Sequence, residues 1–172
     1  MKKLKALAVL AVLAAPVAAP MTAMAGVDVT FTAPEKFTDA SPRGNKNARE
    51  TQRAMDQLSQ YMTKQATRYL KPGQDLKIEV LDIDLAGRVE WWRTNFYDVR
   101  LMRDIDSPAI KLRYSLSENG TTLASGEEWM RDLGYLMGIN VTLGSQDSLK
   151  YEKAMIGTWM RNRLAKFGAT AG

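Results

Sequence analysis

Apolar and polar residues alternate along several parts of the chain, which predicts β-strands there. In residues 27–32 every second residue is apolar, and Pro34 ends the pattern. Residues 75–86 also alternate, but Val80 and Leu81 stand side by side within the pattern. This change of phase indicates a β-bulge near the pair, or a strand that is buried on both faces.

A third alternating segment, residues 110–116, leads into the dipeptide Asn119-Gly120. This dipeptide is typical of a two-residue type I′ turn, in which both residues need a positive φ. We therefore predict a β-hairpin whose second strand is residues 121–129.

The expected register of this hairpin places Leu112 opposite Glu127 and Lys111 opposite Glu128. Lys111 and Glu128 would then form an ion pair across the strands. Glu127 would lie on the apolar face, unless Gly126 starts a bulge that turns it away.

Two further segments have the spacing of amphipathic helices. In the first, Asn47 and Glu50 form a capping box, and Pro72-Gly73 ends the helix. The second covers residues 148–167 and contains Gly157. A glycine inside a helix is costly, so we expect close packing against a neighbouring element there.

The order of elements is therefore strand, helix, strand, irregular segment, hairpin and helix. This order predicts an α+β domain, with a small, mostly antiparallel sheet of about four strands and two helices packed on one face. No repeat or linker divides residues 26–172, so we expect one domain. The patterns leave the paths of residues 87–107 and 132–144 open, apart from a weak alternation at residues 99–103 that indicates a short edge strand.

The first 25 residues differ from the rest of the chain. Lysines precede an apolar run over residues 7–15, and Ala23-Met24-Ala25 follows. These features are typical of a secretory signal peptide that is cleaved after Ala25. The apolar run is shorter than the roughly 18 to 20 residues of a membrane-spanning helix. We expect a periplasmic or extracellular mature chain without a transmembrane anchor.

The chain contains no cysteine and no histidine. Disulfides and thiol nucleophiles are therefore excluded, and the commonest transition-metal ligand and general base are missing. Zinc fingers, haem proteins and Ser-His-Asp hydrolases do not fit this composition. We expect no metal and no cofactor, and the composition favours binding over catalysis.

Charge is unevenly distributed along the sequence. There are 24 Lys and Arg against 19 Asp and Glu, but three of the lysines belong to the leader. Residues 43–71 hold seven basic and two acidic side chains, and residues 148–167 hold five and one. At 100° per residue one stripe opposite the apolar side of the first helix forms a basic helical face, which consists of Arg49, Arg53, Lys64, Arg68 and Lys71.

Two interpretations of the basic helical face are open. It can be a solvated surface that keeps the protein soluble. Alternatively, it can contact an anionic envelope component, such as lipopolysaccharide or phospholipid headgroups, or an acidic protein partner. Nucleic acid is disfavoured because the chain is expected to be exported.

Four carboxylates are weak candidates for chemistry. Asp82 and Asp84 are two residues apart on a strand, so they share a face, and Glu127 or Asp132 could lie nearby. Such a group could serve a carboxylate-dependent hydrolase or bind calcium. The preferred interpretation is structural: a solvated strand face for the two aspartates, and an ion pair for Glu127.

Trp91 and Trp92 lie in the irregular segment with further aromatic residues. They could stack on a sugar or enter a lipid interface. The alternative, which we prefer, is that they pack the loop onto the domain.

Several strings occur in an order that resembles a known family. They are Val27-Asp28-Val29-Thr30-Phe31, Pro72-Gly73-Gln74-Asp75-Leu76, Asp82-Ile83-Asp84-Leu85-Ala86-Gly87, Gly126-Glu127 before Asp132-Leu133, and Tyr151-Glu152-Lys153. With them the mature chain resembles the bacterial secreted family catalogued as domain of unknown function 3016. The resemblance implies export and a single domain, and it adds nothing about chemistry. The leading hypothesis is a non-catalytic binding or envelope-associated module that uses the basic helical face.

Overall fold

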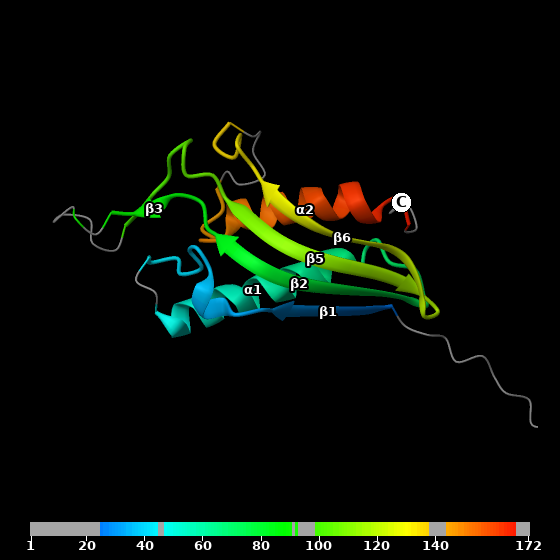
Figure 1. Cartoon of the computed structure of the whole chain (residues 1–172). Helices are drawn as coiled ribbons and strands as arrows, with labels where there is room; N and C mark the ends of the chain where they lie inside the picture. Colours follow the sequence, from blue (N-terminus) through cyan, green and yellow to red (C-terminus); the bar gives the residue numbers. More distant parts are fainter. Residues whose placement is uncertain (1–24, 45–46, 91, 93–98, 138–143, 168–172) are drawn as a thin grey trace, which may run out of the picture.

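A four-stranded mixed sheet carries both helices on one of its faces (Figure 1). The computed structural model describes residues 25–44, 47–90, 92, 99–137 and 144–167, so the expected signal peptide and Trp91 lie outside the described residues. The sheet order is β1-β2-β5-β6. The elements are β1 (Gly26–Phe31), η1 (Pro34–Lys36), α1 (Ala48–Ala66), β2 (Gln74–Asp84), β3 (Arg88–Val89), β4 (Arg100–Leu101), β5 (Ala109–Glu118), β6 (Thr121–Arg131) and α2 (Lys150–Leu164).

The α+β class and the two helices on one face are confirmed, and the sheet is mixed. β1 pairs with β2 in parallel, whereas β5 pairs antiparallel with both β2 and β6. The parallel pair arises because α1 crosses over between β1 and β2, and parallel neighbours need such a connection. The irregular segment contributes a separate two-stranded ladder of β3 and β4.

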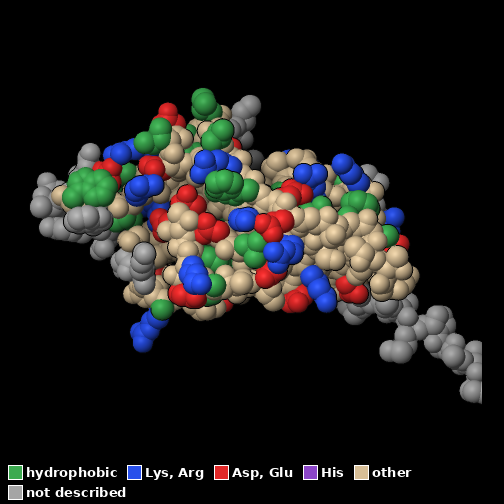
Figure 2. Space-filling view, viewed as in Figure 1, with side chains coloured by type: hydrophobic (Ala, Val, Ile, Leu, Met, Phe, Trp, Pro, Cys, Tyr) green, Lys and Arg blue, Asp and Glu red, His purple; other side chains and the backbone are tan. Residues whose placement is uncertain are grey.

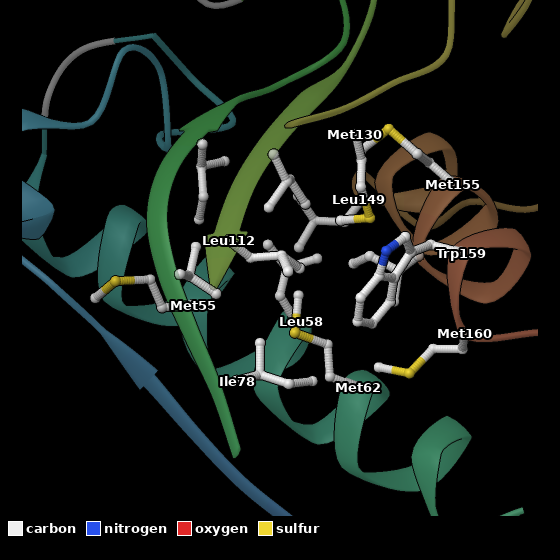
Figure 3. Close-up of a cluster of buried hydrophobic side chains, with 14 of the residues drawn as sticks. Met55, Leu58, Met62, Ile78, Leu112, Met130, Leu149, Met155, Trp159 and Met160 are labelled. Atoms are coloured by element: carbon white, nitrogen blue, oxygen red, sulfur yellow. The ribbon is translucent and has the colours of Figure 1, made fainter. Parts of the chain in front are cut away.

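The core fills the layer between the sheet and the helices (Figure 3). Leu58 and Met62 of α1 are fully buried over Ile78 of β2 and Leu112 of β5. Each strand contributes every second residue and each helix one stripe, so the two periodicities meet in one apolar layer. The glycine in α2 packs closely, as predicted, because a Cβ on Gly157 would lie 3.0 Å from the Tyr61 hydroxyl of α1.

Two local predictions for the strands are confirmed. The pairing of β2 with β5 shifts between Val80 and Asp82, and this bulge returns Ile83 to the buried face. Asn119 and Gly120 have φ values of 49° and 82°, the positive values that a type I′ turn requires.

The predicted hairpin register is wrong by one residue. The shift between β5 and β6 lies at Leu116/Ser117, so Leu116 faces Ala124, Leu112 faces Glu128 and Arg113 faces Glu127. A slip of one residue exchanges the two faces of a strand. Glu127 therefore lies on the open face, and the expected Lys111–Glu128 pair is replaced by a Lys111–Glu127 ion pair.

The predicted helix starts are close to those observed, and the predicted ends are too late. The Asn47 side chain caps α1 by accepting a hydrogen bond from the Arg49 amide at 2.9 Å. The helix ends at Ala66, because the amides of Arg68 and Tyr69 bond to carbonyls three residues back and tighten the last turn. Arg68 and Lys71 consequently follow α1 instead of belonging to it.

Candidate functional site

The basic helical face is exposed along its whole length. All five members are exposed, while Met55, Leu58 and Met62 on the opposite side of α1 are buried. At 1.5 Å per residue, Arg49 and Lys64 are separated by about 22 Å along the helix axis. Among the described residues, Arg53 is the member that forms an ion pair, at 3.0 Å from Glu50. Most of this positive charge is available to a partner.

The second helix extends the same layer, because α1 and α2 pack against each other. Arg161 and Lys166 are exposed at its C-terminal end. Arg163 forms a 2.9 Å ion pair with Glu128 of β6. The one acidic residue of this segment, Glu152, is buried. The outer surface of the helix layer is therefore basic on both helices.

The open face of the sheet carries charges of both signs (Figure 2). Arg113 of β5 binds Glu79 of β2 at 2.7 Å and Glu127 of β6 at 2.9 Å. Lys111 binds the second oxygen of Glu127 at 2.8 Å. The hydrogen bonds from Lys111 and Arg113 lower the pKa of Glu127. Its carboxylate is engaged by two cations, which is the structural role preferred from the sequence.

The other three acidic candidates lie in separate settings. Asp82 accepts hydrogen bonds from the amide and hydroxyl of Thr38, both at 2.7 Å, and thereby fixes the segment after η1. Asp132 accepts a bond from the Gly134 amide at 3.1 Å. Burial, and then repulsion by Asp39, raise the pKa of Asp84. In the described parts of the chain, no group of three or more acidic side chains could hold a metal ion.

Sequence reasoning missed a buried arginine, Arg100 of β4. Its side chain is 8% exposed and forms a 2.8 Å ion pair with Asp39. Its guanidinium also donates to four backbone carbonyls, those of Ser41, Pro42, Ala86 and Gly87. Nothing in the local pattern around Arg100 signals this role, because its partners are 13 to 61 residues away in sequence.

A second missed residue, Glu152 of α2, is 1% exposed. One of its carboxylate oxygens accepts a hydrogen bond from the Ala86 amide at 2.7 Å, and the other has no partner among the described residues. Burial raises the pKa of this carboxyl group. A signal was present in the sequence, because Glu152 precedes the buried Ile156 and Trp159 by four and seven residues and so lies on the apolar stripe.

The aromatic candidates are only partly described. The side chain of Trp92 is 56% exposed, and Trp91 lies outside the described residues. In the described segments neither helix is long and apolar enough to cross a bilayer.

Comparison with known proteins places the chain in a family without giving it an activity. No curated protein and no solved structure matches the chain. One family model does match, over residues 25–162, which include every strand and nearly the whole of α2. The chain therefore belongs to the family described as protein of unknown function (DUF3016), as its sequence motifs indicated.

Proposed function

We propose that this protein is an exported, non-catalytic binding module that docks on an anionic surface of the cell envelope through the basic helical face. One observation carries the proposal: the cations of this face are exposed, and among the described residues only Arg53 is ion-paired. On the open sheet face, Lys111 and Arg113 are instead neutralised by Glu79 and Glu127.

The physical basis is long-range attraction between the helix layer and clustered negative charge. Each Lys or Arg held near an anionic lipid surface contributes about 1 kcal/mol, and the attraction decays over a Debye length of about 8 Å at physiological salt. Five side chains on α1 and the turn that follows it can therefore give strong binding at low salt and weak binding at high salt.

The expected signal peptide supports export to a compartment where such surfaces occur. Lipopolysaccharide and the headgroups of anionic phospholipids both present clustered phosphate. An acidic protein is a different class of partner. Binding to lipopolysaccharide or to vesicles that contain no protein distinguishes these surfaces from such a partner.

The experiment starts from the full chain expressed from Met1 in a bacterium. We expect the protein in the periplasmic fraction, with a mass that corresponds to a start at Gly26. The recovered protein is then mixed with lipopolysaccharide, with anionic vesicles and with neutral vesicles at increasing salt. We expect binding to the two anionic surfaces, with an affinity that decreases as salt rises.

A matched pair of variants assigns the surface. Replacing Arg49, Lys64 and Arg68 by glutamine removes three charges from the basic helical face and should weaken binding about 100-fold at low salt. Replacing Lys36, Lys77 and Lys111 by glutamine removes the same charge elsewhere and should weaken it less than about threefold. No binding at low salt, or equal losses in the two variants, would contradict the proposal.

A further inference from the structure

Large apolar side chains are concentrated at one end of the molecule. The described residues expose nine of them, and all except Leu123 lie where β5 begins and β6 ends or in the adjoining segments (Figures 1 and 2). Single exposed apolar residues are normal, but a group of them marks an interaction site. The apolar end is defined here by Ile105, Trp129, Leu133, Leu136 and Met137.

Two of its members are exposed almost as fully as side chains in an unfolded chain. Met137 is 83% exposed and Ile105 is 79% exposed. Burying such side chains would remove a large apolar surface from contact with water, which is favourable.

The turn that carries three of these residues is held in place by a buried tyrosine. Tyr135 is 5% exposed, and its hydroxyl donates to the Arg103 carbonyl at 2.6 Å. Its ring meets Tyr151 edge-on, with 4.8 Å between the ring centroids. Because Tyr135 points inward and packs, its neighbours Leu133, Leu136 and Met137 remain outside. The exposure is therefore built into an anchored turn.

The charges around this end are arranged asymmetrically. In the Arg88–Asp106 ion pair the arginine side chain is 65% exposed and the aspartate 12%. In the Arg103–Glu90 pair the corresponding values are 40% and 4%. Arg131 is exposed and lies 5.2 Å from the centroid of the Trp129 ring. The carboxylates of these two pairs lie behind the surface, so the outer surface presents guanidinium and apolar groups, together with the exposed carboxylate of Asp104 beside Ile105.

We propose that the apolar end inserts into the interfacial layer of a phospholipid bilayer. Leucine, isoleucine and methionine suit the acyl boundary, while tryptophan is favoured at headgroup depth. Guanidinium groups bind phosphate through two parallel hydrogen bonds, so the exposed arginines match the headgroups.

The shape of this surface supports a bilayer over a small ligand. None of the five residues lines either of two described hollows, one of about 540 Å³ on the open sheet face and one of about 710 Å³ beside the start of α1. Side chains that project from turns can enter a fluid layer without a complementary groove. This inference is independent of the basic helical face.

The test uses neutral phosphatidylcholine vesicles in about 1 M NaCl, where charges are screened beyond about 3 Å. The chain recovered from the periplasm should sediment with these vesicles, whereas attraction through the basic helical face is suppressed. Replacing Ile105, Leu133 and Met137 by serine should lower the partition coefficient more than about 100-fold. Replacing Arg131 by glutamine should reduce the preference for anionic over neutral vesicles.

Leu133→Ser and Leu123→Ser form a matched control pair, because they make the same change at opposite ends of the molecule. We expect a loss of about fivefold to tenfold for Leu133→Ser and less than about twofold for Leu123→Ser. Both melting temperatures should stay near that of the unchanged chain, since both side chains are exposed.

Three results would overturn the proposal. They are no sedimentation of the unchanged chain, equal losses in the two leucine variants, and a dimer that the triple serine variant converts to a monomer. The last result would identify the apolar end as an interface between copies. Loss of binding to soluble dextran sulfate at low salt when Arg49, Lys64 and Arg68 are replaced reports on the basic helical face, so failures of the two proposals can be told apart.

Discussion

The helix face and the open sheet face of this domain carry similar side chains in different arrangements. On the sheet, Arg113 lies between Glu79 and Glu127 on its two neighbouring strands, and each carboxylate meets a cation. On the basic helical face, Arg49 and Lys64 form no ion pair with a described residue. Strand neighbours come from distant sequence and can have opposite sign, whereas the stripe of a helix brings together residues of the same local segment.

This difference shows that composition alone does not tell whether a charge is available to a partner. Paired charges on the sheet contribute to the fold and cancel at a distance. Unpaired charges on the helix contribute little to the fold and sum to a field. The buried ionisable side chains of Arg100 and Glu152 form a third class, whose removal should affect stability most.

The largest expected effect is that of Arg100→Met. The variant removes the donor that Arg100 provides to Asp39 and to four carbonyl groups in a nearly buried site. We expect the free energy of unfolding to fall by about 3 to 5 kcal/mol, measured by urea denaturation. Arg88→Met is the control, since this arginine is 65% exposed, and it should cost less than about 1 kcal/mol. An equal loss of unfolding free energy in Arg100→Met and Arg88→Met would show that the burial of Arg100 does not make it more important for stability than an exposed arginine.

The next effect is a change in the pH dependence of stability for Glu152→Gln. Burial raises the folded-state pKa of Glu152 above its unfolded value, so its carboxyl group destabilises the fold once the unfolded chain ionises. Below a pH of about 4 both states are protonated and the group has no effect. Above that pH, the unfolding free energy of the unchanged chain should fall relative to the variant by about 1.4 kcal/mol per pH unit until the folded pKa is reached.

Urea titrations of both proteins between about pH 4 and pH 8 measure this difference. A difference between the two proteins that stays constant over this range would contradict the raised pKa.

A smaller effect is expected for Arg113→Gln on the open sheet face. The variant leaves Glu79 and Glu127 near each other without the cation between them. We expect the melting temperature at neutral pH to fall by about 2 to 4 °C, and by less in high salt. The double variant Arg113→Gln with Glu127→Gln should recover part of the loss. An unchanged melting temperature for Arg113→Gln would show that its two ion pairs do not support the fold.

The melting temperature of Arg113→Gln should also depend less on acidification than that of the unchanged chain. Hydrogen bonds from Lys111 and then Arg113 lower the folded-state pKa of Glu127. Its stabilisation is therefore present above the unfolded pKa and is lost as pH falls through the folded value. Arg113→Gln removes part of this stabilisation, so the melting temperature should fall less on acidification than that of the unchanged chain.

The smallest effect on stability is expected on the basic helical face. Replacing Arg49, Lys64 and Arg68 by glutamine should change the melting temperature by less than about 2 °C, because the side chains are exposed and glutamine is a good helix former. A loss as large as that of Arg113→Gln would show that these charges support the fold. It would contradict the distinction between paired charges on the open sheet face and unpaired charges on the basic helical face.

The sequence by itself determined the features that depend on neighbouring residues. The alternation in β2, its bulge after Val80, the Asn119-Gly120 turn and the cap at Asn47 follow from side-chain periodicity and backbone preferences. The apolar stripe of α1 and the exposure of its basic side follow from the same geometry. The residues of the candidate binding face could be identified for this reason.

Only the tertiary structure decided what depends on distant segments. The shift in pairing near Leu116 places Glu127 on the open face, and no local pattern reveals it, because a one-residue slip exchanges every side chain between the two faces. Arg100 and Glu152 acquire their partners through contacts 13 to 66 residues apart. Periodicity tells which side of an element faces the core, but the partner of a charge is determined by the register between elements.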